Sequence, residues 1–162
     1  MLERLLGLDH PEVASQYSTL AMYYHSCGYF QMSFTYMYRS LSILQLIAGD
    51  YHPEIAAIHL NLGLMYQEVD QAQATLECYN NSLQQNMHMY SEENIQTASS
   101  FQALAQSHFK LQDGRKGLAA QEKAVQLLQK ILPAEANYVK QAKGQLDYYF
   151  RLSVDIEKRR KF

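Results

Sequence analysis

The chain has no tryptophan and only two cysteines, three prolines and seven glycines among its 162 residues. So little proline and glycine favours helices joined by short turns. Cys27 and Cys78 both fall within helical patterns, so we expect free thiols in a reducing compartment, with a disulfide as the alternative. No apolar run reaches the roughly 18 residues of a membrane span, and residues 1–8 lack a cleavage site. We therefore expect no membrane insertion and no signal peptide.

Motifs of catalysis and metal binding are also missing. There is no Cys-x-x-Cys, no His-Glu-x-x-His and no glycine-rich phosphate loop. His25 and Cys27 are close in sequence, but no acid or amide stands at a matching place to complete a nucleophile pair. His10 and His52 lie one repeat apart, too far to share a metal. We expect no enzyme, no catalytic residue, no metal site and no cofactor.

An internal repeat dominates what is present. His10-Pro11-Glu12 recurs as His52-Pro53-Glu54, and Asn94-Ile95-Gln96 falls in the same register without a gap, so the period is forty-two positions. The same shift aligns four further sets: Ala14, Ala56 and Ala98; Leu20, Leu62 and Leu104; Ala21, Gly63 and Ala105; and Tyr24, Tyr66 and His108. A fixed period of this size predicts stacked repeats, each of which buries its apolar face against its neighbours.

Each repeat contains two segments with apolar residues at helical spacing. The segments predict an all-α solenoid of three antiparallel helix pairs followed by a capping helix, forming a single domain over residues 1–162. The predicted repeats span about residues 10–51, 52–93 and 94–135, and the capping helix about 136–160. Breaks within the repeats are expected at Gly28, near Asp70 and at Asp113-Gly114.

One face of the first helices is predicted to form a groove for an extended ligand. Amides that bond a peptide backbone, beside apolar side chains, are what such a ligand needs. Ordinary solvated polar residues are the alternative explanation. The predicted groove residues are Ser18, Met22, His25, Leu60, Asn61, Leu64, Gln67, Gln102, Gln106, Phe109 and Lys110.

Charge is distributed unevenly although the net charge is only −2. Residues 1–81 carry two basic and eight acidic side chains, against twelve basic and eight acidic in residues 82–162, so the halves stand at −6 and +4. A basic end can mark a surface that binds a polyanion such as RNA, although it can also serve solubility alone. The predicted phosphate contacts are Arg115, Lys116, Lys123, Lys140, Lys143 and Arg151.

The repeated columns resemble the tetratricopeptide repeat. The first helix reads large–x–x–Leu–small–x–x–Tyr. The second helix reads small–x–x–x–large–x–x–small. That family usually repeats every 34 residues, and eight more correspond to about one extra turn on each helix. Repeats of the longer period that open on Gly-x-x-His-Pro, as in Gly7–Pro11 and Gly49–Pro53, resemble those of kinesin light chains.

A further resemblance is to the tetratricopeptide region of the clustered mitochondria protein family. It covers about residues 5–132 and rests on the order of short segments rather than on a single motif. The segments are Gly7-Leu8-Asp9-His10-Pro11, Leu20-Ala21-Met22-Tyr23-Tyr24, Tyr38-Arg39-Ser40-Leu41, His52-Pro53-Glu54-Ile55-Ala56, Asn61-Leu62-Gly63-Leu64-Met65-Tyr66 and Gln121-Glu122-Lys123-Ala124.

The resemblance implies a repeat domain within a large cytoplasmic protein of several domains. That family is associated with distributing mitochondria and with binding messenger RNAs for mitochondrial proteins. It implies an interaction domain that holds a protein or peptide in its groove. The alternatives are an RNA-binding module that uses the basic half, and a cargo adaptor like kinesin light chains. Salt would separate the first two, because phosphate binding weakens steeply as salt rises. The oligomeric state does not follow.

Overall fold

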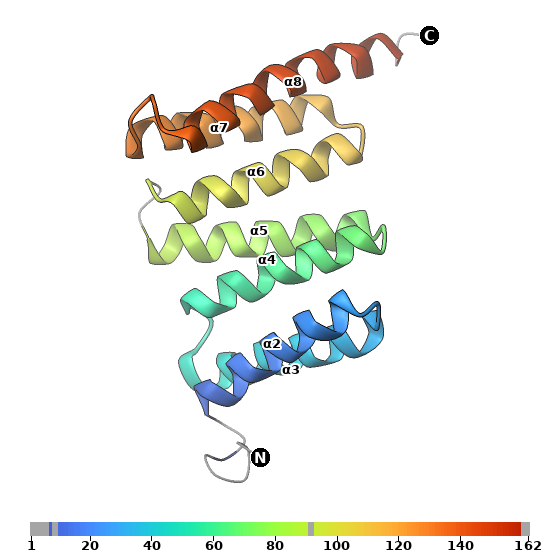
Figure 1. The fold of residues 1–162 in the computed structure, drawn as a ribbon, viewed down its shortest axis with the longest axis vertical. Helices are drawn as coiled ribbons and strands as arrows, with labels where there is room; N and C mark the ends of the chain where they lie inside the picture. The colour runs from blue at the N-terminus through green and yellow to red at the C-terminus, as the bar shows by residue number, and fades with distance from the viewer. Residues whose placement is uncertain (1–6, 8–9, 91–92, 160–162) are drawn as a thin grey trace.

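The computed structural model describes residues 7, 10–90 and 93–159, and these form seven α-helices and no strand (Figure 1). The helices are α2 (Pro11–Ser26), α3 (Phe30–Ala48), α4 (Pro53–Glu68), α5 (Ala72–Met89), α6 (Ile95–Lys110), α7 (Gly114–Ile131) and α8 (Asn137–Arg159). They pack pairwise as α2–α3, α4–α5 and α6–α7, and α8 packs on α7. The predicted all-α repeat fold is confirmed. Leu8, Asp9, Ser91, Glu92 and Arg160 of the predicted segments lie outside the described residues.

The first helix of each pair begins at the same place in the repeat because a side chain caps it. Helices α2, α4 and α6 begin at residues 11, 53 and 95, and α8 begins one repeat length later, at residue 137. Each capping side chain accepts a hydrogen bond from a backbone N–H of the first turn, which has no partner within the helix. These bonds are His10 Nδ1 from Glu12 at 3.2 Å, His52 Nδ1 from Glu54 at 3.3 Å, and Asn94 Oδ1 from Gln96 at 2.9 Å.

Small residues let the two helices of a pair approach closely. The hydroxyl of Ser33 on α3 donates to the backbone oxygen of Ala21 on α2 at 2.8 Å. Further along α3, the hydroxyl of Ser40 donates to the backbone oxygen of Ala14 at 2.7 Å. Both serines are buried, so each bond satisfies a polar group that would otherwise destabilise the core.

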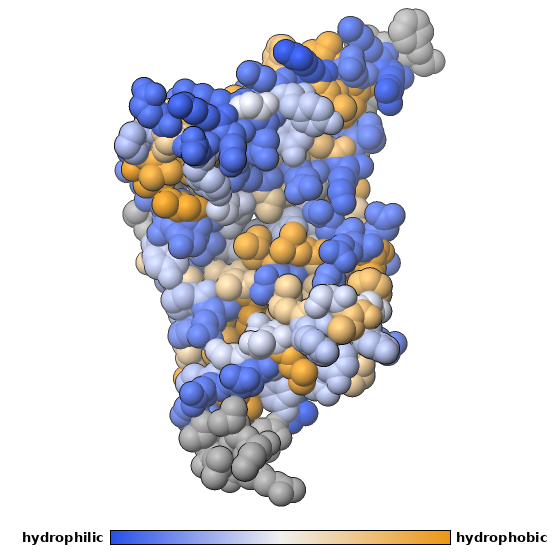
Figure 2. All heavy atoms as spheres, in the orientation of Figure 1, coloured by the Kyte–Doolittle hydropathy of each residue, from blue (hydrophilic) through white to orange (hydrophobic). Residues whose placement is uncertain are grey.

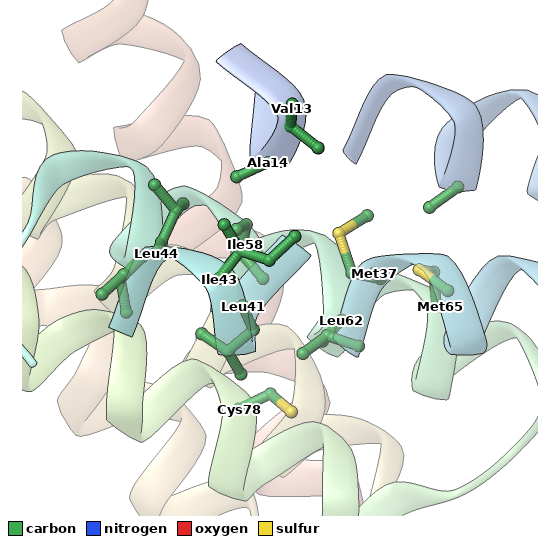
Figure 3. Close-up of a cluster of buried hydrophobic side chains, with 12 residues drawn as sticks. Val13, Ala14, Met37, Leu41, Ile43, Leu44, Ile58, Leu62, Met65 and Cys78 are labelled. Carbon is green, nitrogen blue, oxygen red and sulfur yellow. The ribbon is translucent and has the colours of Figure 1, made fainter. Parts of the chain in front are cut away.

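A hydrophobic cluster joins the first two repeats across α3 and α4 (Figure 3). Met37, Leu41 and Leu44 on α3 meet Ile58 and Leu62 on α4 within it. Leu20, Leu62 and Leu104 occupy the same position in successive repeats. Leu62 is 1% exposed and Leu104 is 5% exposed, because each lies against the repeat before it, whereas Leu20 on α2 is 37% exposed. In the repeat array each unit therefore completes the core of the next.

A second cluster fastens α8 to the last repeat. Ala98 on α6 and Leu128 on α7 pack with Val139 and Ala142 on α8. The buried amide of Gln121 on α7 also donates to the backbone oxygen of Ala142 at 3.0 Å. Residues 137–159 are thus an integral layer of the stack. None of the described helices is both long and apolar enough to cross a membrane.

The two cysteines are free thiols in different surroundings, since Cys27 is exposed and Cys78 is buried. Burial, together with the carboxylate of Glu77, raises the pKa of Cys78 to about 11. Because the thiolate is the reactive form, we expect Cys27 to react with iodoacetamide in the native protein and Cys78 to react only after denaturation. Mass spectrometry of the alkylated peptides measures both. Equal labelling of the two thiols in the native state would contradict the packing of α5.

Candidate functional site

A hollow lies along the first helices of repeats two and three and along α8. We call it the glutamine groove, and it encloses about 360 Å³. Its lining residues come from α4, α6 and α8: Leu60, Leu64, Ser99, Gln102, Ala103, Gln106, Tyr138, Gln141, Gln145 and Tyr149. Four of the ten are glutamines and none carries a charge at neutral pH.

Hydrogen bonds chain the polar groups of the glutamine groove together. The Tyr138 hydroxyl lies 3.0 Å from the Ser99 hydroxyl and donates to Gln102 Oε1 at 3.1 Å. Gln102 Nε2 donates to Gln145 Oε1 at 3.3 Å, which also accepts from Gln121 Nε2 at 3.4 Å. A glutamine amide offers two donors and an acceptor with two lone pairs. The network therefore orients these amides while leaving capacity for a ligand.

Apolar side chains form the rest of the glutamine groove. Leu60 and Leu64 project from α4, and the Tyr149 ring closes the α8 side. That ring stacks on Phe109, with the centroids 4.2 Å apart and the planes 13° apart. Burial, and then the neighbouring Tyr148, raises the pKa of Tyr149 above its ordinary value. The groove stays uncharged through the neutral pH range and combines amides with an apolar wall.

A second hollow of about 270 Å³ lies between repeats one and two. We call it the hydroxyl pocket, and it is lined by Ser15, Ser18, Thr19, Ser40, Glu54, Ala57 and Ile58. Ala57 lines this pocket, and Ser99 and Gln141 line the glutamine groove. These three residues occupy the same position in successive repeats. The two hollows therefore occupy equivalent positions in successive repeats, on opposite sides of α4.

The structure brings together only some of the residues predicted to form the groove. Leu60, Leu64, Gln102 and Gln106 line the glutamine groove, and Ser18 lines the hydroxyl pocket. Gln67 and Lys110 lie instead at a smaller hollow of about 80 Å³ near the ends of α4 and α6. Met22 and Asn61 lie outside all three hollows.

Two predicted groove residues are engaged in other contacts. Phe109 is 5% exposed and packs behind the groove against Tyr149, so it supports the wall rather than facing a ligand. His25 Nε2 lies 3.3 Å from a carboxylate oxygen of Glu68, across the boundary of repeats one and two. Helical spacing alone places both on the predicted face, but it does not reveal how deeply a side chain is buried.

The contribution of α8 to the groove is absent from the sequence prediction. Tyr138, Gln141 and Gln145 stand one repeat length after Gln96, Ser99 and Ala103. Extending the repeat register into the last helix would therefore have found them. The signal is weak because the residues of α8 match the repeat only loosely, so the shared register shows in their spacing and not in their identity.

Three of the six predicted phosphate contacts lie beside acidic side chains of the protein. Arg115 Nε donates to Glu157 Oε1 at 2.7 Å, and this bond raises the pKa of the guanidinium. Acidic partners also stand near the next two: Lys116 Nζ lies 3.3 Å from Asp113 Oδ2, and Lys140 Nζ lies 4.0 Å from Glu135 Oε2.

The other three basic residues differ in their surroundings. Lys123 Nζ lies 5.4 Å from the centre of the Phe101 ring. Lys143 and Arg151 are exposed on α8. Figure 2 shows hydrophilic residues gathered over the α7–α8 end of the visible face. Because acidic residues stand among the basic ones, this end is polar with mixed charge, and the phosphate contacts stay a prediction.

No group of three or more histidine, cysteine, aspartate or glutamate side chains in the described ranges is placed to hold a metal ion. His59 is half-buried on α4, and burial lowers the pKa of its imidazole, so the ring is neutral near pH 7. The polar groups that line the two hollows are mainly amides and hydroxyls.

Comparison with known proteins agrees with the repeat fold. The profile of the tetratricopeptide repeat matches residues 13–54. The clustered mitochondria protein homolog of Culex quinquefasciatus is 28% identical over 118 residues, 73% of this chain and 9% of that protein. The homolog of Danio rerio is 23% identical over 158 residues, 98% of this chain and 11% of that protein. The chain thus spans about a tenth of the length of these relatives.

Solved structures show the same fold at low sequence identity. BtubC (BKLC) from P. vanneervenii superposes with a TM-score of 0.81 at 18% identity, over 92% of this chain and 60% of that one. A Podosopora anserina kinesin light chain with TPR-like repeats gives a TM-score of 0.69 at 19% identity, over 93% and 76%. The chain thus has the fold of stacked tetratricopeptide repeats, and its sequence matches clustered mitochondria protein homologues over most of its length. Such repeats bind peptides and proteins and are typically non-catalytic.

Proposed function

We propose that this tetratricopeptide-repeat region is the protein-interaction domain of a longer, cytoplasmic protein of the clustered mitochondria type, and that it holds an extended peptide in the glutamine groove. In that role it would tether a partner needed for mitochondrial distribution. The proposed domain comprises repeats at about residues 10–51, 52–93 and 94–135 and the helix after residue 136. The likeness to kinesin light chains supports the fold, and a cargo-adaptor role stays the alternative.

The observation that carries the proposal is the chained amide surface of the groove. An extended peptide presents backbone N–H and C=O groups in alternation, and glutamine can satisfy both kinds. Gln106 and Gln141 line the groove and are exposed to solvent. They can bond a ligand without first breaking the Tyr138–Gln102–Gln145 network. Leu60 and Leu64 supply the apolar contact that such a ligand would bury.

A selection experiment tests the proposal and does not require the natural partner. A displayed library of random twelve-residue peptides is selected on the 162-residue chain, and recovered peptides are synthesised for fluorescence anisotropy. The double variant Gln106→Ala/Gln141→Ala removes two groove amides. At about 0.5–1.5 kcal/mol per hydrogen bond, we expect affinity to fall about tenfold.

The matched control removes two exposed glutamines from the second helices, Gln84→Ala/Gln129→Ala, which lie away from the groove. The control should bind peptide as the unchanged chain does. Equal loss of peptide affinity in both variants, or no peptide enrichment at all, would contradict the groove function.

A random single-stranded RNA pool is tested in parallel at low and high salt. Salt-sensitive RNA binding without peptide binding would favour the RNA-binding module.

A further inference from the structure

We propose that the hydroxyl pocket is a subsite for a lysine or arginine side chain of the peptide held in the groove. The inference rests on the proposed function and adds the chemistry of the ligand. Glu54 supplies the one charged side chain among the described residues that line the hydroxyl pocket and the glutamine groove. A cation placed at this carboxylate would set the position of the peptide along the repeats.

The pocket presents acceptors because its hydroxyl protons are already used within the protein. Ser15 Oγ donates to Glu54 Oε2 at 3.3 Å, and Thr19 Oγ1 donates to the Ser15 backbone oxygen at 3.0 Å. Ser18 Oγ donates to Met37 Sδ at 3.7 Å, and Ser40 Oγ donates to the Ala14 backbone oxygen at 2.7 Å. Ser40 is fully buried, whereas the oxygens of Ser15, Ser18 and Thr19 each keep a lone pair for a ligand but have no second proton to give.

A site of acceptors selects a ligand that only donates. A lysine ammonium has three donors and no acceptor, and an arginine guanidinium has five donors and no acceptor. A carboxylate or phosphate would meet oxygen lone pairs and the Glu54 charge, so the pocket rejects it. Ala57 is exposed on the same pocket wall, with buried Ile58 behind it, and gives apolar surface for the methylene stem of a long basic side chain.

The place of the pocket beside the groove allows one continuous ligand to reach both hollows. Ala57 and Ile58 face the pocket from α4, and Leu60 and Leu64 face the groove from the same helix. A peptide that crosses α4 would therefore place its basic residue in the pocket and an uncharged stretch against the glutamines. The two hollows together predict a ligand with one cation flanked on one side by neutral residues.

Glu12 provides a matched control within the same chain. It stands one repeat length before Glu54, follows a His-Pro pair in the same way, and its N–H is likewise capped by a histidine. It does not line the pocket. Substituting either glutamate by glutamine removes one negative charge from the first turn of a helix. Only Glu54→Gln removes the charge from the pocket.

The test compares peptide selections on three proteins: the unchanged chain, Glu54→Gln and Glu12→Gln. We expect lysine or arginine to be enriched at one position on the unchanged chain and on Glu12→Gln, and the enrichment to vanish on Glu54→Gln. A synthetic peptide from the first selection should bind Glu54→Gln about five- to tenfold more weakly, as expected for a charge-assisted hydrogen bond. Raising salt should weaken its binding to the unchanged chain more than to Glu54→Gln.

The outcomes separate this inference from the proposed function. Peptides that bind the groove with no basic preference, or with a preference that survives Glu54→Gln, would overturn the subsite and leave the groove intact. Loss of the preference on both variants would assign it to general charge and would also overturn the subsite. Failure to enrich any peptide would overturn both. Circular dichroism of each variant confirms that a lost preference does not come from unfolding.

Discussion

Replacing Gly63 by leucine is expected to lower the free energy of unfolding by about 3 kcal/mol or more, because the new side chain must displace a fully buried aromatic ring. A Cβ atom added at Gly63 would overlap the Tyr79 ring. Tyr79 has no exposed surface and its hydroxyl donates to Gln67 Oε1 at 3.4 Å, so the ring has little room to move. Leucine is the better helix former by roughly 0.8 kcal/mol, which offsets only a small part of the clash.

The same substitution at Gly144 is the control. Gly144 lies within α8, and a Cβ atom there would meet no neighbour within 4 Å. Gly144→Leu should therefore raise the free energy of unfolding by about 0.5–1 kcal/mol through helix propensity alone. Urea titrations followed by circular dichroism measure both variants. A similar effect at the two glycines would show that α4 and α5 do not cross as closely as the structure places them.

The fold can be predicted from the sequence because the same pattern of capping, small and apolar residues recurs in three successive repeats. His10, His52 and Asn94 cap equivalent helices, although only two of them precede a proline. Glycine inside a helix is unfavourable, so Gly63 in the repeated small-residue column predicts a close crossing, whereas Gly144, outside that column, has no neighbour within 4 Å of its Cβ position. The partner at that crossing, Tyr79, cannot be read from the sequence. It depends on which rotamer fills the space between α4 and α5.

The site is less predictable because a repeat fixes helix faces but not the depth of each side chain. Helical spacing places Gln102 and Gln106 on the groove face, and they do line the groove. The same spacing assigns Phe109 to that face. Its ring turns toward α7 and α8 because Gly117 leaves space for an aromatic ring there. The sequence also gives no sign of the chemistry of Glu54, since an acidic residue at a helix start is fully explained by the helix dipole.

Phe109→Ala is expected to cost about 3–5 kcal/mol of stability, as for other buried aromatic residues. The ring fills the space between α6, α7 and α8, where it contacts both Tyr149 and the Gly117 backbone. Had Phe109 faced the groove, truncation would have weakened ligand binding and left stability nearly unchanged. Thermal unfolding of the variant separates the two positions. A shift in melting temperature of less than about 2 °C would restore the groove assignment.

A second substitution tests whether the loss comes from that specific space. A Cβ atom added at Gly117 would lie 2.7 Å from the Phe109 ring, so Gly117→Ala alone should be destabilising. In the Phe109→Ala background the same methyl group enters the vacated space and gains the helix propensity of alanine. The double variant should therefore be more stable than the sum of the single effects predicts, by about 1–3 kcal/mol. Strict additivity would mean that Phe109 and Gly117 do not touch, and that the wall behind Tyr149 is built by other residues.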